Sequence, residues 1–474
     1  MPCLRLFLAA FRLPRRLFAA AAASGATLFG VGLLVVSVGV VAVAGGPMLA
    51  GAPAASAAVS CTTPCDPGVR PGVAAGGFIS GLSATQIALF NSTKQTFGEI
   101  DSVSGSMAGE AGSGLGPRFN MNSCSGCHAQ PAVGGSSPAT NPQVAVAKLR
   151  GATNSVPFFI TLNGPVREAR FKRNADGSPD GGVHDLFTIS GRTDAPGCNI
   201  AQPDFNTAAA QGNLVFRIPT PTFGAGLIEG IPDSAILRNE GANQRGKALL
   251  GMSGKVNREG NTGTITRYGW KAQNKSLLLF AGEAYNVEQG VTNEVFPNER
   301  TEAGCVFNGI PEDHTDFDTG ASGDLVQFSI FMRFLAAPTP GPSTPSTTNG
   351  QKLFGTVGCG LCHTPRLVTA RSSTPLALSN KDVDLFSDLL VHDMGSGLAD
   401  GISQGSAGPD EFRTAPLWGI GQRIFFLHDG RTTDLLEAVQ AHASAGSEAN
   451  AVINNFDALG ASQKQDVLNF LRSL

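Results

Sequence analysis

Apolar and polar positions follow a helical period most clearly at the C-terminal end of the chain. Residues 462–474 are predicted to form an amphipathic helix, capped by Ser462, whose inward side chains are Val467, Leu468, Phe470, Leu471 and Leu474. Residues 432–443 show the same period, whereas residues 156–162 and 182–189 are typical of strands. The pattern therefore predicts a mainly α-helical protein with long loops and a minor β component in its first half.

The N-terminal residues follow a different pattern, that of an export signal. Four arginines are the only charged residues before an uncharged stretch over 17–65, whose centre at 31–44 is strongly apolar, and a small-residue cleavage site follows at 55–57. The apolar part is longer than the usual ~7–15 residues. We therefore assign residues 1–57 to a cleaved export signal or to a retained N-terminal membrane anchor, and expect the protein to be periplasmic or otherwise extracytoplasmic.

The rest of the chain is predicted to have two similar halves. Residues 58–337 form a Gly-rich first half, residues 338–348 a stiff uncharged linker with four prolines, and residues 349–474 a compact second half. Each half contains one C-x-x-C-H motif. Downstream of it, each has a Phe-Arg pair followed by Pro and Gly-x-Gly, starting at Phe216 and Phe412. This recurrence indicates a duplicated unit.

The composition excludes some classes of function. The 34 Lys and Arg nearly balance the 37 Asp and Glu, with a formal net charge of −3, so the chain is not predicted to coat nucleic acid or an anionic membrane. Charged residues make up only 15%, against ~25% in an ordinary soluble domain, while Gly and Pro number 60 and 29. With 42% hydrophobic residues, the chain can still fill a core.

The two C-x-x-C-H motifs carry the predicted chemistry. This motif attaches haem c: the two sulfurs bond to the haem vinyl groups, and the adjacent histidine reaches the iron. Zinc is disfavoured because the chain is exported and has no further cysteine pair at ligand spacing, and a redox disulfide is disfavoured because histidine follows both motifs. We predict two covalently bound haem c groups, held by Cys124, Cys127, His128, Cys359, Cys362 and His363.

Four of the other cysteines are candidates for disulfides. Cys61 and Cys65 could close a small terminal loop, and Cys198 and Cys305 could pair across the first half. Free or partly modified thiols are the alternative.

The order of several motifs resembles the di-haem oxidoreductase family. The resemblance rests on the segments GLGPRFNMNSCSGCH, DGGVHDLFTISGR, GAGLIEGIPDSAIL, GCGLCHTP, FSDLLVHDMGSGLADG, FRTAPLWGIG and FLHDGRTTDLLEAVQAH, and it extends over roughly residues 82–474. That family is sometimes labelled thiol oxidoreductase and is related to bacterial di-haem cytochrome c peroxidases. The resemblance implies two class-I cytochrome c-like domains with one haem in each. Similar proteins include peroxidases, protein-modifying enzymes and electron carriers.

The sixth ligand of each iron decides what that haem does, because an iron with two strong protein ligands transfers electrons and an open position can bind peroxide. In the related peroxidases, a His-Asp-Gly segment precedes the methionine ligand of the electron-transfer haem by fourteen residues. Counting from His428 reaches His442, which we expect to bind the second iron. Met394 is the rival ligand. A solvated His442 and a core-packed Met394 are the simpler alternatives.

Further residues are assigned roles around the haems. His184 is the predicted distal ligand of the first haem and, with Glu229, a predicted catalytic residue; Glu110 and Glu283 are alternative acid–base groups. Arg217 and Arg413 are predicted to pair with haem propionates. The resemblance suggests that His392 and His428 bond to propionates or hold the domain interface.

Two other features allow a structural and a functional interpretation. Trp270 and Trp418 are expected to pack in the core, with electron transfer between the haems as the alternative. The loop over 312–318 is expected to be a plain acidic loop in which His314 is solvated, with calcium binding as the alternative.

The sequence thus predicts an exported di-haem c-type oxidoreductase of the peroxidase kind. The second haem would accept electrons from a small periplasmic donor, such as a cytochrome c or a copper protein, and the first would react with peroxide or another small oxidant. The rival prediction is a non-catalytic electron-transfer protein in which both irons have two protein ligands. No nucleic-acid partner is expected, and the membrane is contacted only through an uncleaved anchor.

Overall fold

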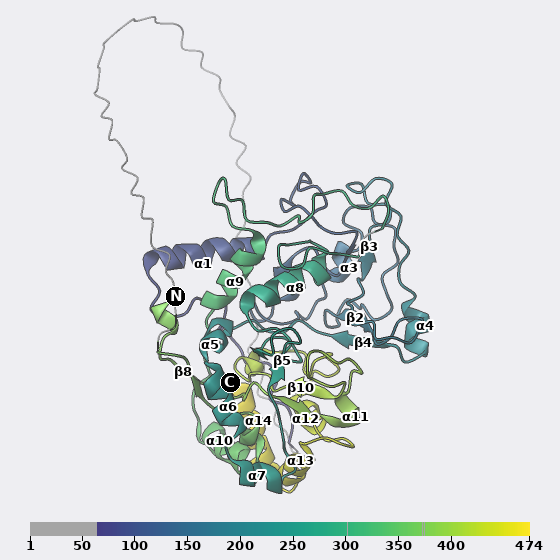
Figure 1. The fold of residues 1–474 in the computed structure, drawn as a ribbon. Coiled ribbons are helices and arrows are strands. Elements are labelled where there is room, and N and C mark those ends of the chain that lie inside the picture. The colour runs from purple at the N-terminus through teal and green to yellow at the C-terminus, as the bar shows by residue number, and fades with distance from the viewer. Residues whose placement is uncertain (1–63, 301, 372, 374) are drawn as a thin grey trace, which may run out of the picture. The chain divides into compact units, whose positions relative to one another are not determined.

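A computed structural model describes residues 64–300, 302–371, 373 and 375–474, which belong to one compact unit (Figure 1). The predicted export signal and Cys61 lie outside the described residues. The longer helices are α1 (Ala84–Phe97), α8 (Leu277–Gln289), α9 (Asp324–Phe334), α10 (Pro345–Val357) and α14 (Ala461–Ser473). No helix within this part of the chain is long and apolar enough to cross a membrane.

The remaining elements are short. The helices are α2 (Cys124–Cys127), α3 (Gln143–Val146), α4 (Phe205–Ala210), α5 (Ala225–Gly230), α6 (Asp233–Glu240), α7 (Gln244–Leu249), α11 (Gly395–Leu398), α12 (Leu435–Gln440) and α13 (Asn450–Asp457). The 3-10 turns are η1 (Cys359–Leu361), η2 (Leu376–Leu378) and η3 (Ile420–Gln422). The protein is therefore mainly helical, as predicted.

The strands pair two by two, always antiparallel. The pairs are β1 (Arg118–Phe119) with β3 (Phe187–Thr188), β2 (Glu168–Phe171) with β4 (Leu214–Arg217), β5 (Asn257–Arg258) with β6 (Ile265–Thr266), β7 (Leu367–Val368) with β8 (Asp382–Val383), and β9 (Val391–Asp393) with β10 (Glu411–Arg413). The minor β component thus extends into the second half as well.

In the first half, α1, α8 and α9 pack around a phenylalanine-rich core (Figure 1). α1 begins at a capping box in which Ser83 accepts a hydrogen bond from the N–H of Gln86, while the Gln86 side chain accepts one from the N–H of Ser83. The ring of Phe97 in α1 lies 4.7 Å from that of Phe331 in α9 and 6.0 Å from that of His128, centre to centre. This core therefore backs the first C-x-x-C-H motif.

The second half is built on α10 and α14, which pack along their length. Thr344 caps α10, and Pro345 takes its first position, where the missing N–H would have no helical partner in any case. Phe354 of α10 lies 5.5 Å from Phe470 of α14 and 6.0 Å from His363, between ring centres. This core backs the second motif in the same way.

One local feature of the predicted duplicated unit recurs in both halves of the structure. The sheet β2–β4 in the first half ends at Arg217, and the sheet β9–β10 in the second half ends at Arg413. Downstream of these arginines the chain turns at Gly224 and Gly419, whose φ angles are 66° and 75°. Glycine adopts this left-handed conformation without the steric cost of a Cβ atom.

The predicted linker over 338–348 is shorter than expected, because residues 345–348 form the first turn of α10. Each half has a hydrophobic cluster of its own, but the linker does not keep the two halves apart. One cluster contains buried side chains from both halves, among them Phe331, Leu335, Leu367 and Leu389. The two halves therefore share a core in this structure.

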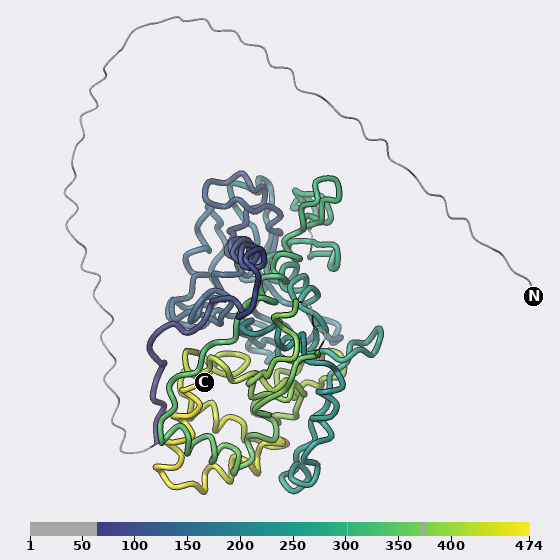
Figure 2. Tube along the Cα trace, turned by 90° about the vertical axis from the view of Figure 1, so that its left-hand side faces the viewer, coloured from purple at the N-terminus to yellow at the C-terminus, as the bar shows by residue number. Residues whose placement is uncertain are grey.

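The described N-terminal segment also joins the halves (Figure 2). Before the chain enters α1, Asp66 pairs with Arg472 of α14 at 2.5 Å and accepts the N–H of Leu435 at 2.8 Å. The N–H of Arg70 donates to the carbonyl of Gly421 at 2.7 Å. The first half is thus fastened to the C-terminal helix by its own N-terminal residues.

The two predicted helices form. The helix over 462–474 is confirmed as α14, with the predicted inward side chains buried. The helix over 432–443 is confirmed but shorter, as α12, because Asp434 caps its first turn and the chain leaves the helix after Gln440.

The strand predictions are less accurate. The strand over 156–162 is wrong: Phe159 and Ile160 are both buried, and the N–H of Ile160 donates back to the carbonyl of Pro157, so the segment turns instead of alternating. Of the strand over 182–189, only β3 is paired as a strand.

Candidate functional site

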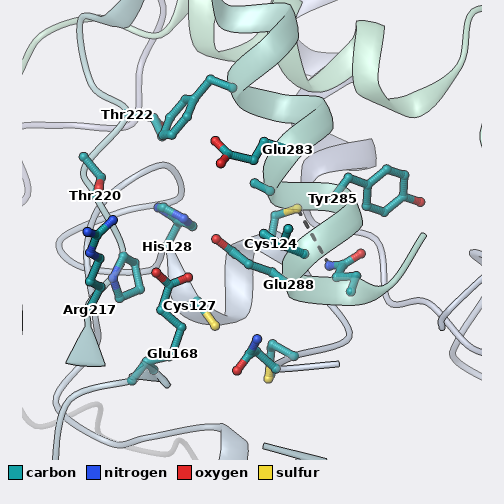
Figure 3. Close-up of a pocket in the computed structure, with 18 of the residues that line it drawn as sticks. Cys124, Cys127, His128, Glu168, Arg217, Thr220, Thr222, Glu283, Tyr285 and Glu288 are labelled. Carbon is teal, nitrogen blue, oxygen red and sulfur yellow. Dashed lines mark hydrogen bonds between the residues drawn. The ribbon is translucent and has the colours of Figure 1, made fainter. Parts of the chain in front are cut away.

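Two cavities contain the C-x-x-C-H motifs. The first has a volume of about 1090 Å³ and lies between α2, α8, β2 and β4 (Figure 3). Cys124 and Cys127 are the first and last residues of α2, and His128 follows them, so one helical turn brings both thiols and the imidazole to the cavity wall.

His128 is held in a defined tautomer. Its Nδ1 lies 2.9 Å from the carbonyl oxygen of Gly135, which can only accept, so Nδ1 carries the hydrogen. Burial lowers the pKa of His128 and favours the neutral ring. Nε2 is therefore left with a lone pair, as a metal ligand requires.

Three carboxylates line the first cavity: Glu168 on β2, and Glu283 and Glu288 on α8 (Figure 3). Glu168 pairs with Nε of Arg170 at 3.0 Å, and Glu283 accepts a hydrogen bond from Asn274. Burial, with the neighbouring charge of Glu168, raises the pKa of Glu288 above its ordinary value. The protonated form of Glu288 is therefore favoured, and the cavity contains a carboxylic acid able to donate a proton.

Arg217 lines the first cavity, as its predicted role requires. It donates to Asp400 through Nη2 and to Gln404 through Nη1, both at 2.6 Å. Its buried Nε finds no hydrogen-bond partner among the described residues. Arg217 thus joins the two halves and keeps one donor for a further acceptor.

The second cavity, of about 1320 Å³, contains the second motif. Cys359 begins η1, and Cys362 and His363 follow it directly. Nδ1 of His363 donates to the carbonyl of Phe386 at 2.9 Å, the same arrangement as at His128. Burial, followed by the neighbouring His442, lowers the pKa of His363 to about 4.

His442 lies just beyond the C-terminal end of α12 and lines the second cavity, as the sequence predicts. Its Nδ1 lies 2.8 Å from the carbonyl oxygen of Ala438, so Nε2 is again left with the lone pair. Met394, the rival ligand, lines the same cavity and packs beside Trp270 and Phe412. The second cavity therefore offers the imidazole of His442 and the thioether of Met394 beside His363.

Two arginines in the second cavity have unsatisfied donors. Nη1 of Arg413, and Nε and Nη2 of Arg423, are buried without a hydrogen-bond partner among the described residues. Burial lowers the pKa of both side chains to about 10. Buried guanidinium groups are normally paired with carboxylates. These donors therefore fit a carboxylate-bearing ligand such as haem, and they extend the predicted role of Arg413 to Arg423.

Trp270 lies between the cavities and is the one described residue that lines both. Its Nε1 donates to the carbonyl of Ile218 at 2.9 Å, and Arg423 lies 5.5 Å from its ring. Trp418 lines neither haem-motif cavity and packs against Gly224, the position expected of a core residue. The two tryptophans therefore differ in position.

The structure contradicts the predicted roles of His184 and Glu229. Nε2 of His184 lies 3.0 Å from Asp180, and its ring stacks on Phe171, so the side chain does not line the first cavity. Glu229 is paired with Arg333 at 2.6 Å, again away from the cavity. Backbone pairing of β2 with the segment after residue 182 turns the His184 ring outward.

Of the two alternative acid–base candidates, one lines the first cavity and the other does not. Glu110 is buried beside Arg150 at 3.1 Å and does not line the cavity, whereas Glu283 does. Glu168 and Glu288 were not identified from the sequence. The available signal was the placement of Glu283 and Glu288 within α8, a helix otherwise rich in apolar residues.

His392 and His428 occupy the second cavity wall. His392 lies between Asp388 at 3.0 Å and Glu448 at 2.8 Å, so both ring nitrogens are engaged and neither is left for a metal. The ring of His428 stacks on Phe412 at 4.3 Å, and its carbonyl accepts the N–H of Ile218 from the first half. His428 therefore sits at the interface of the halves, as the resemblance suggested.

The acidic loop over 312–318 uses its carboxylates locally. Asp313 accepts the backbone N–H groups of Asp324 and Leu325 at the start of α9, and Asp316 accepts those of Asp318 and Thr319. His314 is exposed. These contacts favour the plain acidic loop over a calcium site.

The predicted disulfide between Cys198 and Cys305 is confirmed and spans a sequence separation of 107 residues. Cys61 lies outside the described residues, so its predicted pairing with Cys65 stays a prediction. The motif cysteines, Cys124, Cys127, Cys359 and Cys362, are thiols in this structure.

Comparison with known proteins gives one family. The family described as "Di-haem oxidoreductase, putative peroxidase" matches residues 172–474, well over half of the chain. No curated protein matches the sequence.

Two solved structures show a distant similarity. A hydrazine synthase chain of Kuenenia stuttgartiensis has a TM-score of 0.23 and 19% identity, over 41% of this chain and 60% of that one. A MauG-like protein associated with microbial copper homeostasis has a TM-score of 0.26 and 16% identity, over 47% of this chain and 77% of that one. The chain thus spans three fifths of the hydrazine synthase chain, and neither similarity carries a functional argument.

Proposed function

Because the chain belongs to the di-haem oxidoreductase family, we propose that it is an exported enzyme with two covalently attached haem c groups, which reduces peroxide at the first cavity with electrons received at the second. The haem groups would supply the one-electron redox chemistry. Each half would form a cytochrome c-like domain around its motif.

The residues of both cavities fit haem c. In each, two thiols and an imidazole come from one turn of chain, and the imidazole Nδ1 is bonded to a backbone carbonyl. The unsatisfied donors of Arg217, Arg413 and Arg423 suit propionates. Cys124, Cys127, Cys359 and Cys362 would form the thioether bonds.

The observation that carries the proposed division of roles is the difference between the cavities. The second offers His442 as a further imidazole beside His363. Of the described residues that line the first cavity, His128 is the one histidine; three glutamates and the thioethers of Met121 and Met332 line it as well. Two imidazoles suit an electron-transfer site, whereas an iron with one strong ligand suits a reacting site.

The first cavity contains groups for the proton chemistry of peroxide reduction. Glu288 holds a proton, and Glu168 beside it is neutralised by Arg170. A protonated carboxylic acid that faces bound peroxide can donate to the departing oxygen, as general acids do. The low exposure of Gln143 and Asn120, which line the same cavity, keeps this exchange away from bulk water.

Electrons would enter at the second cavity and pass Trp270. A small periplasmic donor, such as a cytochrome c or a copper protein, is the proposed partner. Trp270 lines both cavities, so its aromatic ring lies between the two motifs. The Cys198–Cys305 disulfide supports an oxidising compartment such as the periplasm.

Carbon monoxide binding tests the proposal. The fully reduced protein should bind one carbon monoxide per chain, at the first haem, because the second iron has two protein ligands. No binding to the reduced protein would instead indicate a non-catalytic electron-transfer protein with both irons sealed. Hydrogen peroxide turnover with a reduced small donor would then complete the assignment.

Covalent attachment has its own test. Acid-denatured protein, expressed with the haem maturation machinery, should retain two haems per chain. Cys127→Ala should weaken one attachment and Cys362→Ala the other. A ratio near one in the wild-type protein would contradict the assignment of two haem c groups.

A further inference from the structure

A buried polar path leads from the first cavity toward solvent, and the proposed mechanism does not use it. It begins at Asn120, which lines the cavity. Nδ2 of Asn120 lies 3.4 Å from Oδ1 of Asp185, and the same carboxylate oxygen accepts from Nη2 of Arg300 at 3.0 Å. Side-chain exposure rises from 2% at Asp185 to 35% at Arg300. These three side chains therefore connect the cavity wall with the surface.

Many polar atoms around this path are unsatisfied. The buried atoms that lack a hydrogen-bond partner among the described residues include Asn120 Oδ1, Gln143 Oε1, Gln202 Oε1, Arg118 Nε, Glu299 Oε2 and Arg300 Nη1. They surround Asp185: Gln143 donates to the carbonyl of Asn120, and Gln202 donates to the carbonyl of Asp185. Since buried polar atoms are nearly always satisfied by protein or water, these atoms indicate places for ordered water.

The charges that face Asp185 come from two segments of the first half. Arg300 and Arg118 are positive, and Glu299, whose own pKa burial raises to about 8, lies beside them. Burial outweighs the two arginines and raises the pKa of Asp185 to about 7. The carboxyl group can therefore both take up and release a proton near neutral pH.

The position of Asp185 follows from the local backbone. His184 and Asp185 are neighbours in an extended segment, so their side chains point to opposite sides. His184 faces Asp180 and Phe171, and Asp185 faces Asn120 and Arg300. Of this pair, the aspartate is the residue connected with the cavity.

We propose that Asp185, through Asn120 and the water held by the unsatisfied atoms, carries protons from solvent at Arg300 into the first cavity. This inference rests on the proposed function. Reduction of hydrogen peroxide to two waters breaks the O–O bond and consumes two electrons, which the donor supplies, and two protons, which this path supplies. Asp185 touches neither peroxide nor haem, so it is a positioning residue that acts through Asn120.

The test compares Asp185→Asn with a matched control. The substitution keeps the size of the side chain and removes the titrating group, whereas Asp180→Asn alters a nearby carboxylate that pairs with His184 outside the cavity. With saturating donor, D185N should lower kcat for peroxide by at least about ten-fold, leave KM unchanged and remove the inflection of kcat near pH 7. D180N should behave as the wild-type protein does.

A second variant and a second measurement make the test independent of folding and of peroxidase activity. Asn120→Val interrupts the path at the cavity but leaves the Asp185–Arg300 pair, and it should lower kcat as D185N does. The reduction potential of the first haem should fall as pH rises through about 7 in the wild-type protein, because ionised Asp185 stabilises the oxidised iron. That dependence near pH 7 should vanish in D185N and persist in D180N, while the further dependence that Glu288 causes at higher pH should remain in both.

The outcomes separate the two proposals. A wild-type protein without peroxide turnover contradicts the proposed function, while a pH-dependent potential that D185N abolishes still supports the path. Unchanged kcat in either D185N or N120V, in a protein that does turn over peroxide, overturns the path. So does a dependence of the potential through about pH 7 that D185N retains.

Discussion

At the scale of single residues, three histidine side chains share one hydrogen-bonding arrangement. His128, His363 and His442 each have Nδ1 within 2.9 Å of a backbone carbonyl oxygen, at 2.9, 2.9 and 2.8 Å respectively, and each lines a cavity with the other side of the ring. A carbonyl at Nδ1 fixes the tautomer and raises the basicity of Nε2 toward a metal. Histidines that lack this arrangement, such as His392 and His184, are engaged by carboxylates instead.

His442 provides the first residue-scale prediction. His442→Ala should convert the second haem from low-spin to wholly or partly high-spin, because it removes an imidazole whose free nitrogen faces the cavity. Met394→Leu, a substitution of similar volume in the same cavity, should leave the spin state unchanged. Absorption and electron paramagnetic resonance spectra of the oxidised protein measure this. The reverse result, with M394L opening the iron, would assign the second haem to His/Met ligation.

Glu288 provides the second residue-scale prediction. Glu288→Gln keeps the shape of the side chain but removes the acid, so peroxide turnover should fall by roughly 10²–10⁴-fold. Burial raises the folded-state pKa of Glu288, so the acid is present below that pKa and is lost as the pH rises through it. Wild-type turnover should therefore decline toward alkaline pH, and the residual turnover of E288Q should not.

The control for Glu288 lies outside the cavity. Glu259→Gln alters a carboxylate that pairs with Lys275 at 2.8 Å, and both the rate and the pH profile should match the wild-type protein. Equal rates for E288Q and E259Q would exclude Glu288 as the proton donor.

The predicted site residues that the structure brings to a cavity are those whose positions follow from local geometry. The C-x-x-C-H residues lie together because they occupy one turn, and His442 faces its cavity because it continues the inward side of α12. The prediction for His184 failed because the direction of its side chain depends on pairing with β2, which is distant in the sequence. Glu288 was missed for a similar reason: the sequence does not say which side of α8 faces the motif.

At the scale of helices and strands, the contact between α10 and α14 depends on one glycine. At Gly350 a Cβ atom would overlap the carbonyl of Asp466 in α14, whereas at Gly355, one turn further along α10, a Cβ atom would meet nothing within 4 Å. The two helices can therefore approach closely only because residue 350 has no side chain.

This difference predicts opposite effects of one substitution in one helix. Gly350→Ala should destabilise the protein by about 1–3 kcal/mol, because backbone atoms of α14 must move. Gly355→Ala should stabilise it by about 0.5–1 kcal/mol, because alanine loses less conformational freedom in a helix. Denaturant unfolding followed by circular dichroism measures both. A G350A protein as stable as G355A would mean that α10 and α14 are further apart than described here.

The sequence predicts the elements that depend on a local pattern better than those that depend on pairing between distant segments. A periodic apolar stripe such as that of α14 is a local pattern, and its helix forms over almost the expected residues. The two-residue strands, in contrast, consist of pairings between distant segments, as in β1 with β3 or β7 with β8. Runs that short leave no periodic pattern in either partner, so they could not be predicted from either segment alone.

The halves are joined, at the scale of the whole described unit, by a common core and by the N-terminal segment. Leu367 and Leu389 follow the second motif but pack with Phe331 and Leu335 of the first half. Asp66 reaches Arg472 from the opposite end of the chain. Sequence similarity between the halves indicated a duplication. It could not indicate that the copies share a core, because the residues of a shared core are apolar, as they would also be in two separate cores.

Limited proteolysis distinguishes a shared core from two separate ones. Most residues over 339–344 are exposed, and this segment lies outside the helices and strands, so a protease of broad specificity should cut there first. After denaturation, the cleaved protein should separate into two fragments that each retain haem. Under native conditions the fragments should stay together at the mass of the intact chain, also in high salt, because an apolar cluster with side chains from both halves joins them. Fragments that part without denaturant would contradict the shared core, and a segment that resists cleavage would contradict its exposure.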